Sequence, residues 1–250
     1  MTSKYAAAHE KPNGPDDTRP TALQVIEDNA LEGKLSGKVV LITGCSSGIG
    51  VETARALYRT GATLYATARD VEKAKAALSD LEDHSRVHVL QLDLSSLDLV
   101  RHLFQSSSPV FSSRTIILLS CAHQAGPVHF RNLTLKGKYE PWKVYGQSKT
   151  ANIYIAREIE KRYGSDDQLK QVWADGKKLA KTWKSPEQGT AKTVLAAISP
   201  ELEGKGGLYL EDTQVARPPG TGLAGYADWA YSEDGPGRLW DISLELLKLV

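Results

Sequence analysis

The apolar and polar positions between residues 37 and 100 alternate between two patterns. Three short runs are continuously apolar and rich in β-branched residues: KVVLIT, ATLYATAR and RVHVLQLDL. Runs of this kind are typical of strands buried on both faces. Val51–Thr60 and Val71–Leu81 separate them and have the composition and length of helices, with Gly61 as a stop signal after the first. Because strands that alternate with helices pair in parallel through right-handed crossovers, this part of the chain predicts a β-α-β-α-β unit.

The second half continues the alternation with fewer strands. The expected elements are a helix at Asp98–Gln105, a buried strand at RTIILLS, an amphipathic helix at Tyr145–Tyr163, a polar lysine-rich helical region to about Thr182, a helix at Pro186–Ile198 capped by Ser185, a short strand at GGLYLED and a helix at Arg238–Leu249. The pattern as a whole predicts an α/β fold.

The first 36 residues differ from the rest. Residues 1 to about 20 are polar and contain several Pro and Gly, which is typical of a disordered arm. Thr21–Glu27 has the pattern of a short amphipathic helix. We therefore expect residues 1–36 to be a partly disordered N-terminal extension and residues 37–250 to form a single domain, which this length supports.

Composition excludes several classes of function. The chain has 250 residues and a net charge of +1, so no overall charge favours nucleic acid or an anionic membrane. The basic cluster from Trp173 to Lys184 is interpreted as a solvated helix with an apolar side, not as a nucleic-acid surface. No apolar run approaches the ~20 residues that a membrane-spanning helix needs, and the N-terminus lacks the apolar core of a signal peptide.

Cysteine and histidine usage points to a reducing compartment and no metal. Cys45 and Cys121 are the two cysteines, which is too few for a disulfide framework or a zinc quartet. The six histidines show no ligand spacing, so no metal site is expected. We expect a protein of the cytoplasm.

A glycine-rich loop follows the first strand directly. Its spacing is Gly44-x-x-x-Gly48-x-Gly50, and the next helix starts immediately after it. Helix-terminal amides and the helix dipole attract negative charge there, and missing side chains let an anion approach the backbone. In dinucleotide-binding folds the anion is a pyrophosphate, so the loop indicates a dinucleotide site.

The run TGxxxGIG resembles the short-chain dehydrogenase/reductase family, and within it the retinol-dehydrogenase-like and fungal branches. The resemblance extends from about Gly37 to the C-terminal helix. It implies a Rossmann-like, doubly wound parallel sheet with helices on both faces, a small-molecule carbonyl or alcohol substrate, and homo-oligomers formed through the helix that begins at Tyr145. It also implies that the cofactor's diphosphate lies on Thr43, Gly44, Ser46, Ser47, Gly48, Ile49 and Gly50.

Two further positions bear on the cofactor. The second strand ends in Arg69-Asp70. An arginine there pairs with a 2′-phosphate, whereas an acid accepts hydrogen bonds from a 2′-hydroxyl, so Arg69 favours NADP over NAD, with Asp70 as a competing group. Asp93 matches the family position that touches the adenine, and a helix-capping role is the alternative.

The resemblance also supplies the catalytic groups. Tyr145 and Lys149 are four residues apart on one helix face, with Thr150 continuing the family pattern. The ammonium lowers the phenol pKa, so that the tyrosine exchanges a proton with the substrate oxygen, and the same pair lies against the cofactor's ribose. A second pair, Tyr139 and Lys143, has a proline within its spacing, which argues against one continuous helix face.

Ser120 stands where the family places its carbonyl-binding serine, at the end of the RTIILLS strand, with a plain strand-end cap as the alternative. Two segments that the family has are missing from this sequence, one before Ser120 and one after Gly164. Asp93 to Ser120 leaves no room for a strand and a helix that the family has there, and a strand ending in Pro-Gly is missing after Gly164. Neighbouring strands must then pair anew or leave a gap in the sheet.

These losses leave two functions open. The first is an oxidoreductase with NADP, in which Ser120, Tyr145 and Lys149 are catalytic. The second is a degenerate, non-catalytic relative that binds a nucleotide or a partner.

Overall fold

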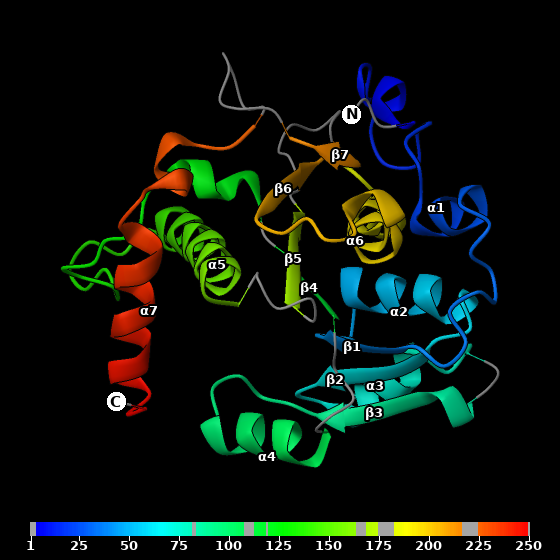
Figure 1. Ribbon diagram of the computed structural model, residues 1–250, viewed down its shortest axis with the longest axis horizontal. Coiled ribbons are helices and arrows are strands. Elements are labelled where there is room, and N and C mark those ends of the chain that lie inside the picture. The colour runs from blue at the N-terminus through cyan, green and yellow to red at the C-terminus, as the bar shows by residue number, and fades with distance from the viewer. Residues whose placement is uncertain are drawn as a thin grey trace. The chain divides into compact units, whose positions relative to one another are not determined.

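Figure 1 shows the computed structural model, which describes residues 4–81, 84–107, 113–118, 120–163, 169–174, 183–216 and 225–249. The chain divides into two compact units. We call Pro15–Ser112 with Lys184–Leu195 the glycine-loop unit. The tyrosine unit consists of Met1–Gly14, Ser113–Trp183 and Ala196–Val250.

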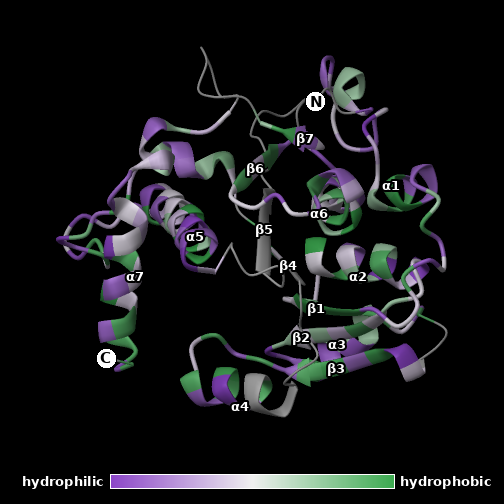
Figure 2. Cartoon of the chain, viewed as in Figure 1, coloured by the Kyte–Doolittle hydropathy of each residue, from purple (hydrophilic) through white to green (hydrophobic). Residues whose placement is uncertain are grey.

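The glycine-loop unit is built on the predicted β-α-β-α-β arrangement. Its three parallel strands lie in the order β1-β2-β3: β1 Val39–Thr43, β2 Thr63–Ala68 and β3 Val87–Gln91. The crossover helices are α2, Ile49–Arg59, and α3, Val71–Ala77. Right-handed crossovers in one direction place both helices on the same face of the sheet. Figure 2 shows β1 as a largely hydrophobic segment, as its apolar sequence requires.

Further helices belong largely to this unit. α1, Ala22–Asp28, packs on α2 and begins at Thr21, whose hydroxyl accepts a hydrogen bond from the Gln24 amide at 3.2 Å. α4, Leu97–Ser107, follows β3. α6, Pro186–Ile198, begins with the predicted cap, because the Gln188 amide donates to Ser185 Oγ at 3.4 Å. These helices agree with the sequence prediction within a few residues.

A second sheet forms the centre of the tyrosine unit. Its strand order is β4-β5-β6-β7, with bounds Ser113–Leu118, Leu169–Ala174, Leu208–Glu211 and Gln214–Val215. β4, β5 and β6 are parallel, and β7 returns antiparallel to β6. The fold is therefore α/β with parallel sheets flanked by helices, as the sequence predicts.

β5 corrects two predictions. The sequence predicts a polar helical region here, and it predicts that the family strand after Gly164 is missing. The structure instead has a strand at Leu169–Ala174, paired in parallel with β4 on one side and with β6 on the other. Pairing on both edges overrides the weak local helix preference of a lysine-rich sequence. The rest of that region, 164–168 and 175–182, lies outside the described residues.

The missing segment before Ser120 has a visible consequence for strand pairing. The described strands form two separate sheets, in which β1 pairs only with β2 and β4 pairs only with β5. Among the described strands, no pairing joins the two sheets.

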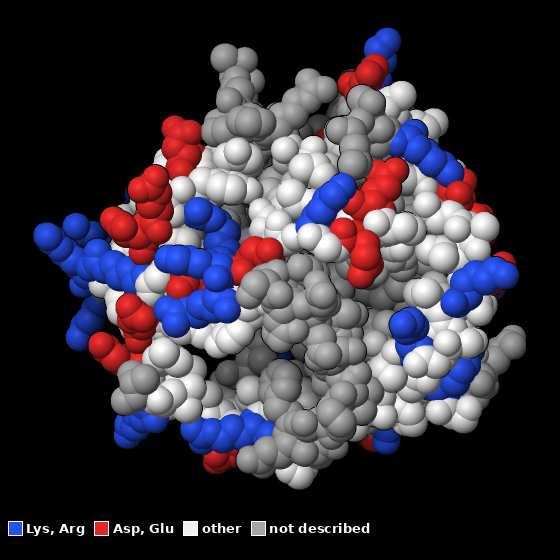
Figure 3. Space-filling view, in the orientation of Figure 1, with Lys and Arg blue, Asp and Glu red and all other residues white. Residues whose placement is uncertain are grey.

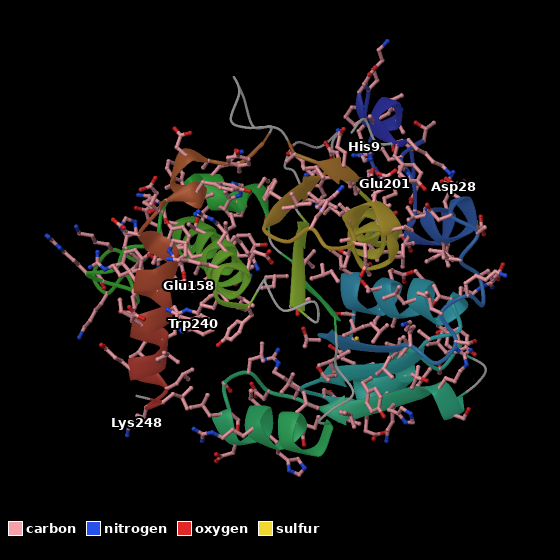
Figure 4. All side chains as sticks on the ribbon, viewed as in Figure 1. His9, Asp28, Glu158, Glu201, Trp240 and Lys248 are labelled. Atoms are coloured by element: carbon pink, nitrogen blue, oxygen red, sulfur yellow. The ribbon has the colours of Figure 1, made fainter. Side chains whose placement is uncertain are left out.

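α5 and α7 pack side by side in the tyrosine unit (Figure 1). α5 spans Pro141–Tyr163 and starts four residues before the predicted Tyr145, since a proline is well accommodated in the first helical position. α7 spans Gly235–Leu246. Between them lies the carboxylate of Glu158, which accepts a hydrogen bond from Arg162 Nε at 2.7 Å, and Figure 4 shows Glu158 near Trp240 of α7.

Short 3-10 helices complete the described elements of both units. They are η1 Ala6–His9, η2 His84–Arg86, η3 Cys121–Ala125, η5 Pro200–Leu202 and η6 Asp228–Tyr231, of which η2 belongs to the glycine-loop unit. The first lies within the predicted disordered arm, whose described residues are structured. His9 is held by a 2.8 Å hydrogen bond between Nε2 and Thr213 Oγ1 in the β6–β7 turn. Tyr5 is 7% exposed, so apolar burial and a long-range hydrogen bond order what the polar composition predicts as disordered.

The described surface carries both signs of charge. On the face in Figure 3, Lys and Arg side chains lie among Asp and Glu side chains, in line with a net charge of +1. Within the described part of the chain, no helix is both long and apolar enough to cross a membrane.

Candidate active site

The glycine loop links β1 to α2 in a tight turn. Gly44 and Gly48 have φ angles of +79° and +61°, a region that side-chain-bearing residues rarely adopt. The amides of Gly44 and Cys45 both donate to the Thr67 carbonyl at 2.9 Å, which ties the loop to the end of β2. A methyl group on Gly50 would lie 2.3 Å from the Gly44 carbonyl oxygen. The loop therefore closes on itself so tightly that only glycine fits at this position.

The outer side of the loop is suited to an anion. Among the described residues, the amides from Ser46 to Gly50 donate to no protein group, and Ser47, Gly48 and Ile49 are exposed. These amides surround the N-terminus of α2, where the helix dipole favours negative charge. A side-chain carbon on Gly48 would meet no atom within 4 Å, so the space above the loop is open. The diphosphate of a dinucleotide fits this combination of unpaired amides and bare backbone.

Cys45 lies on the buried side of the glycine loop. Its thiol is completely buried and lies 3.4 Å from the Ile42 carbonyl oxygen. Burial raises the pKa of Cys45 to about 12, against a smaller opposing effect of a backbone hydrogen bond at Thr67. The side chain is therefore a neutral packing group and not a nucleophile.

The groups expected at the ribose and adenine follow β2 and β3. Arg69 is exposed directly after β2. Asp70 is the N-cap of α3, and its carboxylate accepts from the Lys73 amide at 3.0 Å. Asp93 accepts from both the amide and the hydroxyl of Ser95, at 2.9 and 2.8 Å. These bonds lower the pKa of the Asp93 carboxyl, and the positive charge of Arg69 adds a smaller effect.

Ser120 begins η3 after the end of β4. Its Oγ accepts a hydrogen bond from the Ala122 amide at 3.2 Å, which is the cap that the sequence allows as an alternative role. That bond uses an acceptor position of the hydroxyl, so its hydrogen remains available to donate elsewhere. The capping role and a carbonyl-binding role are therefore compatible.

Tyr145 and Lys149 lie on the same side of α5. The Lys149 Nζ lies 5.1 Å from the centre of the Tyr145 ring, and the ring is 42% exposed. Partial burial lowers the pKa of Lys149. Between them, Gly146 packs directly on η3, since a methyl group there would lie 2.5 Å from the Ala122 carbonyl oxygen. The first turns of α5 and the segment that starts at Ser120 are thus in direct contact.

The competing pair has a different setting. Tyr139 precedes α5 and is 67% exposed, whereas Lys143 is inside the helix and pairs with Glu140 at 2.7 Å. Tyr139 and Lys143 therefore do not share a helix face, as Pro141 predicts.

The structure thus collects the predicted residues in two groups. The glycine-loop unit contains the residues from Thr43 to Gly50 with Arg69 and Asp93, and the tyrosine unit contains Ser120, Tyr145 and Lys149. No group of three or more His, Cys, Asp or Glu suited to a metal ion occurs among the described residues.

Two residues that the sequence did not identify lie against the catalytic candidates. Trp142 stacks on Tyr145 with ring centres 5.6 Å apart and planes at 25°. His123 is fully buried, with Nδ1 lying 3.0 Å from the Ser120 carbonyl oxygen and Nε2 accepting from the Ala227 amide at 3.1 Å. The stacking of Trp142 on Tyr145 could have been predicted, because residues at i and i+3 are neighbours on a helix surface. No sequence signal distinguished His123 from a surface histidine.

Several known proteins are similar to this chain. A family model described as short chain dehydrogenase matches residues 38–140. "Short-chain dehydrogenase/reductase prx1" of Penicillium roqueforti is 35% identical over 324 residues, covering 98% of this chain and 95% of the relative. "Oxidoreductase calI" of Penicillium decumbens is 30% identical, covering 98% of each. "Retinol dehydrogenase 12" of Mus musculus is 26% identical, covering 86% of this chain and 87% of the relative.

Solved structures show the same fold. A crystal structure titled as a putative uncharacterized protein from Mycobacterium Paratuberculosis superposes with a TM-score of 0.74, at 24% identity, covering 92% of this chain and 98% of that one. A "short chain dehydrogenase/reductase family protein" has a TM-score of 0.57, at 20% identity, over 71% of this chain and 97% of the other.

The chain belongs to the short-chain dehydrogenase/reductase family and is an oxidoreductase of that family with a Rossmann fold. Enzymes of this family bind a nicotinamide dinucleotide and act on small molecules. The alignment with the prx1 relative extends over 324 positions and this chain has 250 residues, so at least 74 positions, the difference, have no counterpart here. The chain is therefore shorter than this relative within the aligned region.

Proposed function

We propose that this protein is an NADP-dependent oxidoreductase that interconverts a carbonyl and a primary or secondary alcohol, with Tyr145 as the acid/base. The main observation in support is the direct contact between the two segments that carry the candidate catalytic groups. Gly146, next to Tyr145, packs on the Ala122 carbonyl, two residues after Ser120. Such contact brings a hydroxyl donor and an acid/base group to the same part of the tyrosine unit.

Each residue then has a distinct chemical role. The Ser120 hydroxyl donates to the substrate oxygen, because its bond to the Ala122 amide leaves its hydrogen available. The Tyr145 hydroxyl transfers a proton to that oxygen during reduction and removes it during oxidation. The Lys149 Nζ lies 5.1 Å from the centre of the Tyr145 ring, and we assign it the role of holding the cofactor's ribose beside the tyrosine. When bound, the dinucleotide supplies or accepts the hydride.

The setting of Arg69 and Asp70 supports NADP over NAD. Asp70 accepts the Lys73 amide through Oδ1 as the cap of α3, so one of its two carboxylate oxygens is already in use. Arg69 is exposed beside it, and a guanidinium matches a phosphate in charge and geometry. We therefore expect Arg69→Ala to weaken NADPH binding at least tenfold and to change NADH binding little, measured by isothermal titration.

The surroundings of Tyr145 support an apolar substrate. Trp142 stacks on the tyrosine ring and is 46% exposed. An exposed indole beside the reacting hydroxyl favours contact with an apolar or aromatic group next to the carbonyl. Cys45 and Cys121 are not joined in a disulfide, which supports a reducing compartment such as the cytoplasm. The family resemblance also leads us to propose that copies of this chain associate through α5. Light scattering would show whether the protein forms oligomers.

One experiment tests the catalytic assignment. NADPH oxidation is followed with a panel of aldehydes and ketones for the wild type, Tyr145→Phe and Tyr139→Phe. General acid–base catalysis contributes about 10²- to 10⁴-fold, so Tyr145→Phe is expected to lose at least ~100-fold in kcat. Tyr139→Phe is the matched control, since it removes the hydroxyl of the other Tyr-x-x-x-Lys pair. Equal rates for the wild type and Tyr145→Phe would remove Tyr145 from the mechanism.

A further inference from the structure

His123 is a fully buried polar side chain close to the catalytic candidates. It lies in η3, three residues after Ser120, and has no exposed surface. Both ring nitrogens are bonded to the main chain: Nδ1 lies 3.0 Å from the Ser120 carbonyl oxygen, and Nε2 lies 3.1 Å from the Ala227 amide nitrogen. A buried histidine satisfied in this way connects two separate segments.

The two partners fix the protonation state of the ring. The Ala227 amide only donates, so Nε2 must accept and therefore has no hydrogen. The Ser120 carbonyl only accepts, so Nδ1 must carry the hydrogen and donate it. His123 is thus a neutral imidazole with its hydrogen on Nδ1. A second hydrogen on Nε2 would face the hydrogen of the Ala227 amide.

The main chain of His123 is bound as firmly as its ring. Its carbonyl oxygen accepts from Trp229 Nε1 at 2.9 Å and lies 3.2 Å from the Thr150 hydroxyl. Thr150 is fully buried on α5 and directly follows Lys149. The same residue therefore contacts the serine segment through its ring and the helix of Tyr145 and Lys149 through its carbonyl.

We propose that His123 is a positioning residue that fixes Ser120 relative to Tyr145 and Lys149. This inference rests on the proposed function, in which those three residues are catalytic. The Ser120 carbonyl accepts two hydrogen bonds from His123, one from Nδ1–H and one from the main-chain amide at 3.0 Å, and together they hold the main chain from which the reacting hydroxyl projects. The close contact of Gly146 with the Ala122 carbonyl leaves little free space between η3 and α5. A displacement of about 1 Å at such a site costs ~100-fold in rate.

Two substitutions separate the two ring bonds. In His123→Asn, the side-chain amide nitrogen occupies the place of Nδ1 and donates to the Ser120 carbonyl, but the Ala227 amide loses its acceptor. In His123→Gln, the amide oxygen occupies the place of Nε2 and accepts from Ala227, but the bond to Ser120 is lost. Each variant therefore breaks one buried hydrogen bond, and we expect similar decreases in melting temperature.

The expected result is a difference in kcat that stability does not explain. His123→Asn keeps kcat within about tenfold of the wild type, whereas His123→Gln loses ~100-fold, with KM for NADPH unchanged in both. Equal kcat losses in the two variants, or a wild-type kcat in His123→Gln, would overturn the inference. A wild type without turnover on any carbonyl would instead contradict the proposed function.

A measurement on the wild type covers the case in which the variants fail to fold. Long-range ¹H–¹⁵N NMR spectra at pH 7 distinguish the two neutral forms of a histidine ring. We expect one fully buried histidine with its hydrogen on Nδ1 and a protected Nδ1–H signal. A His123 ring that carries its hydrogen on Nε2, or that is doubly protonated, would overturn the inference whatever the activity is.

Discussion

Replacing Gly50 by alanine tests whether the glycine loop is closed as tightly as the structure shows. The new methyl group would lie 2.3 Å from the Gly44 carbonyl oxygen and 2.8 Å from its carbonyl carbon. Non-bonded heavy atoms settle at about 3.5 Å, so the loop must open by roughly 1 Å. Both contacts are with backbone, which cannot rotate away as a side chain can.

The magnitude follows from two effects of this opening. Overpacking of this kind costs about 1–3 kcal/mol of unfolding free energy, which is a fall of about 2–12 °C in melting temperature for a chain of this length. Moving the loop amides by ~1 Å also weakens their bonds to the diphosphate. One hydrogen bond to a charged group is worth about 1.5–3 kcal/mol, so NADPH is expected to bind ~10- to 100-fold more weakly.

Gly189→Ala is the matched control. Gly189 lies within α6 in the same unit, and a methyl group there would lie 3.6 Å from the Ile49 side chain, an ordinary contact. Alanine is favoured over glycine inside a helix by up to about 1 kcal/mol, so this variant should be as stable as the wild type or more so. Melting temperatures with and without NADPH measure both effects. If Gly50→Ala melts and binds NADPH like the wild type, the loop is not closed as described, and the reasoning fails.

Three further predictions concern single side chains. Burial lowers the pKa of Lys149 in the folded protein below its ordinary value of 10.5. Between these two pKa values the unfolded chain keeps the ammonium proton that the folded chain has lost. The unfolding free energy therefore rises as pH increases through this window. Urea unfolding at several alkaline pH values should show this rise in the wild type relative to Lys149→Met, and parallel curves would contradict it. With a thiol pKa of about 12, Cys45 should not react with a thiol reagent at pH 8, whereas half-buried Cys121 should react slowly; labelling of Cys45 in folded protein would contradict its burial. His9→Ala removes the bond to Thr213 and should cost about 0.5–1.5 kcal/mol of unfolding free energy by urea titration. His9 is labelled in Figure 4. An unchanged urea midpoint in His9→Ala would mean that the N-terminal segment does not contribute to stability.

Local signals were sufficient for the glycine-loop unit. β1 is a continuous apolar run followed by glycines, and Ser185, the cap of α6, was recognisable from sequence. These features depend on neighbours within a few residues, which is why they could be predicted. The Asp70 cap of α3 depends equally on local sequence, since its partner is the Lys73 amide three residues later.

Long-range contacts explain what was missed. β5 is a strand because β4 and β6, far away in the sequence, pair with both of its edges. His9 is ordered by Thr213, which is 204 positions away. His123 gains its partner Ala227 from a segment 104 residues later. No periodicity within a short window contains this information.

The division of the described strands into two sheets has a consequence for how the protein behaves in a crowded solution. Among the described strands, β1 and β4 each have a hydrogen-bonded neighbour on one edge. A strand with one open edge presents a row of amides and carbonyls that an extended peptide can join by strand addition. Both strands are short, with five and six residues, which limits the gain from such addition. Because short strands offer few backbone groups to such a peptide, we expect strand addition at β1 or β4 to be weak.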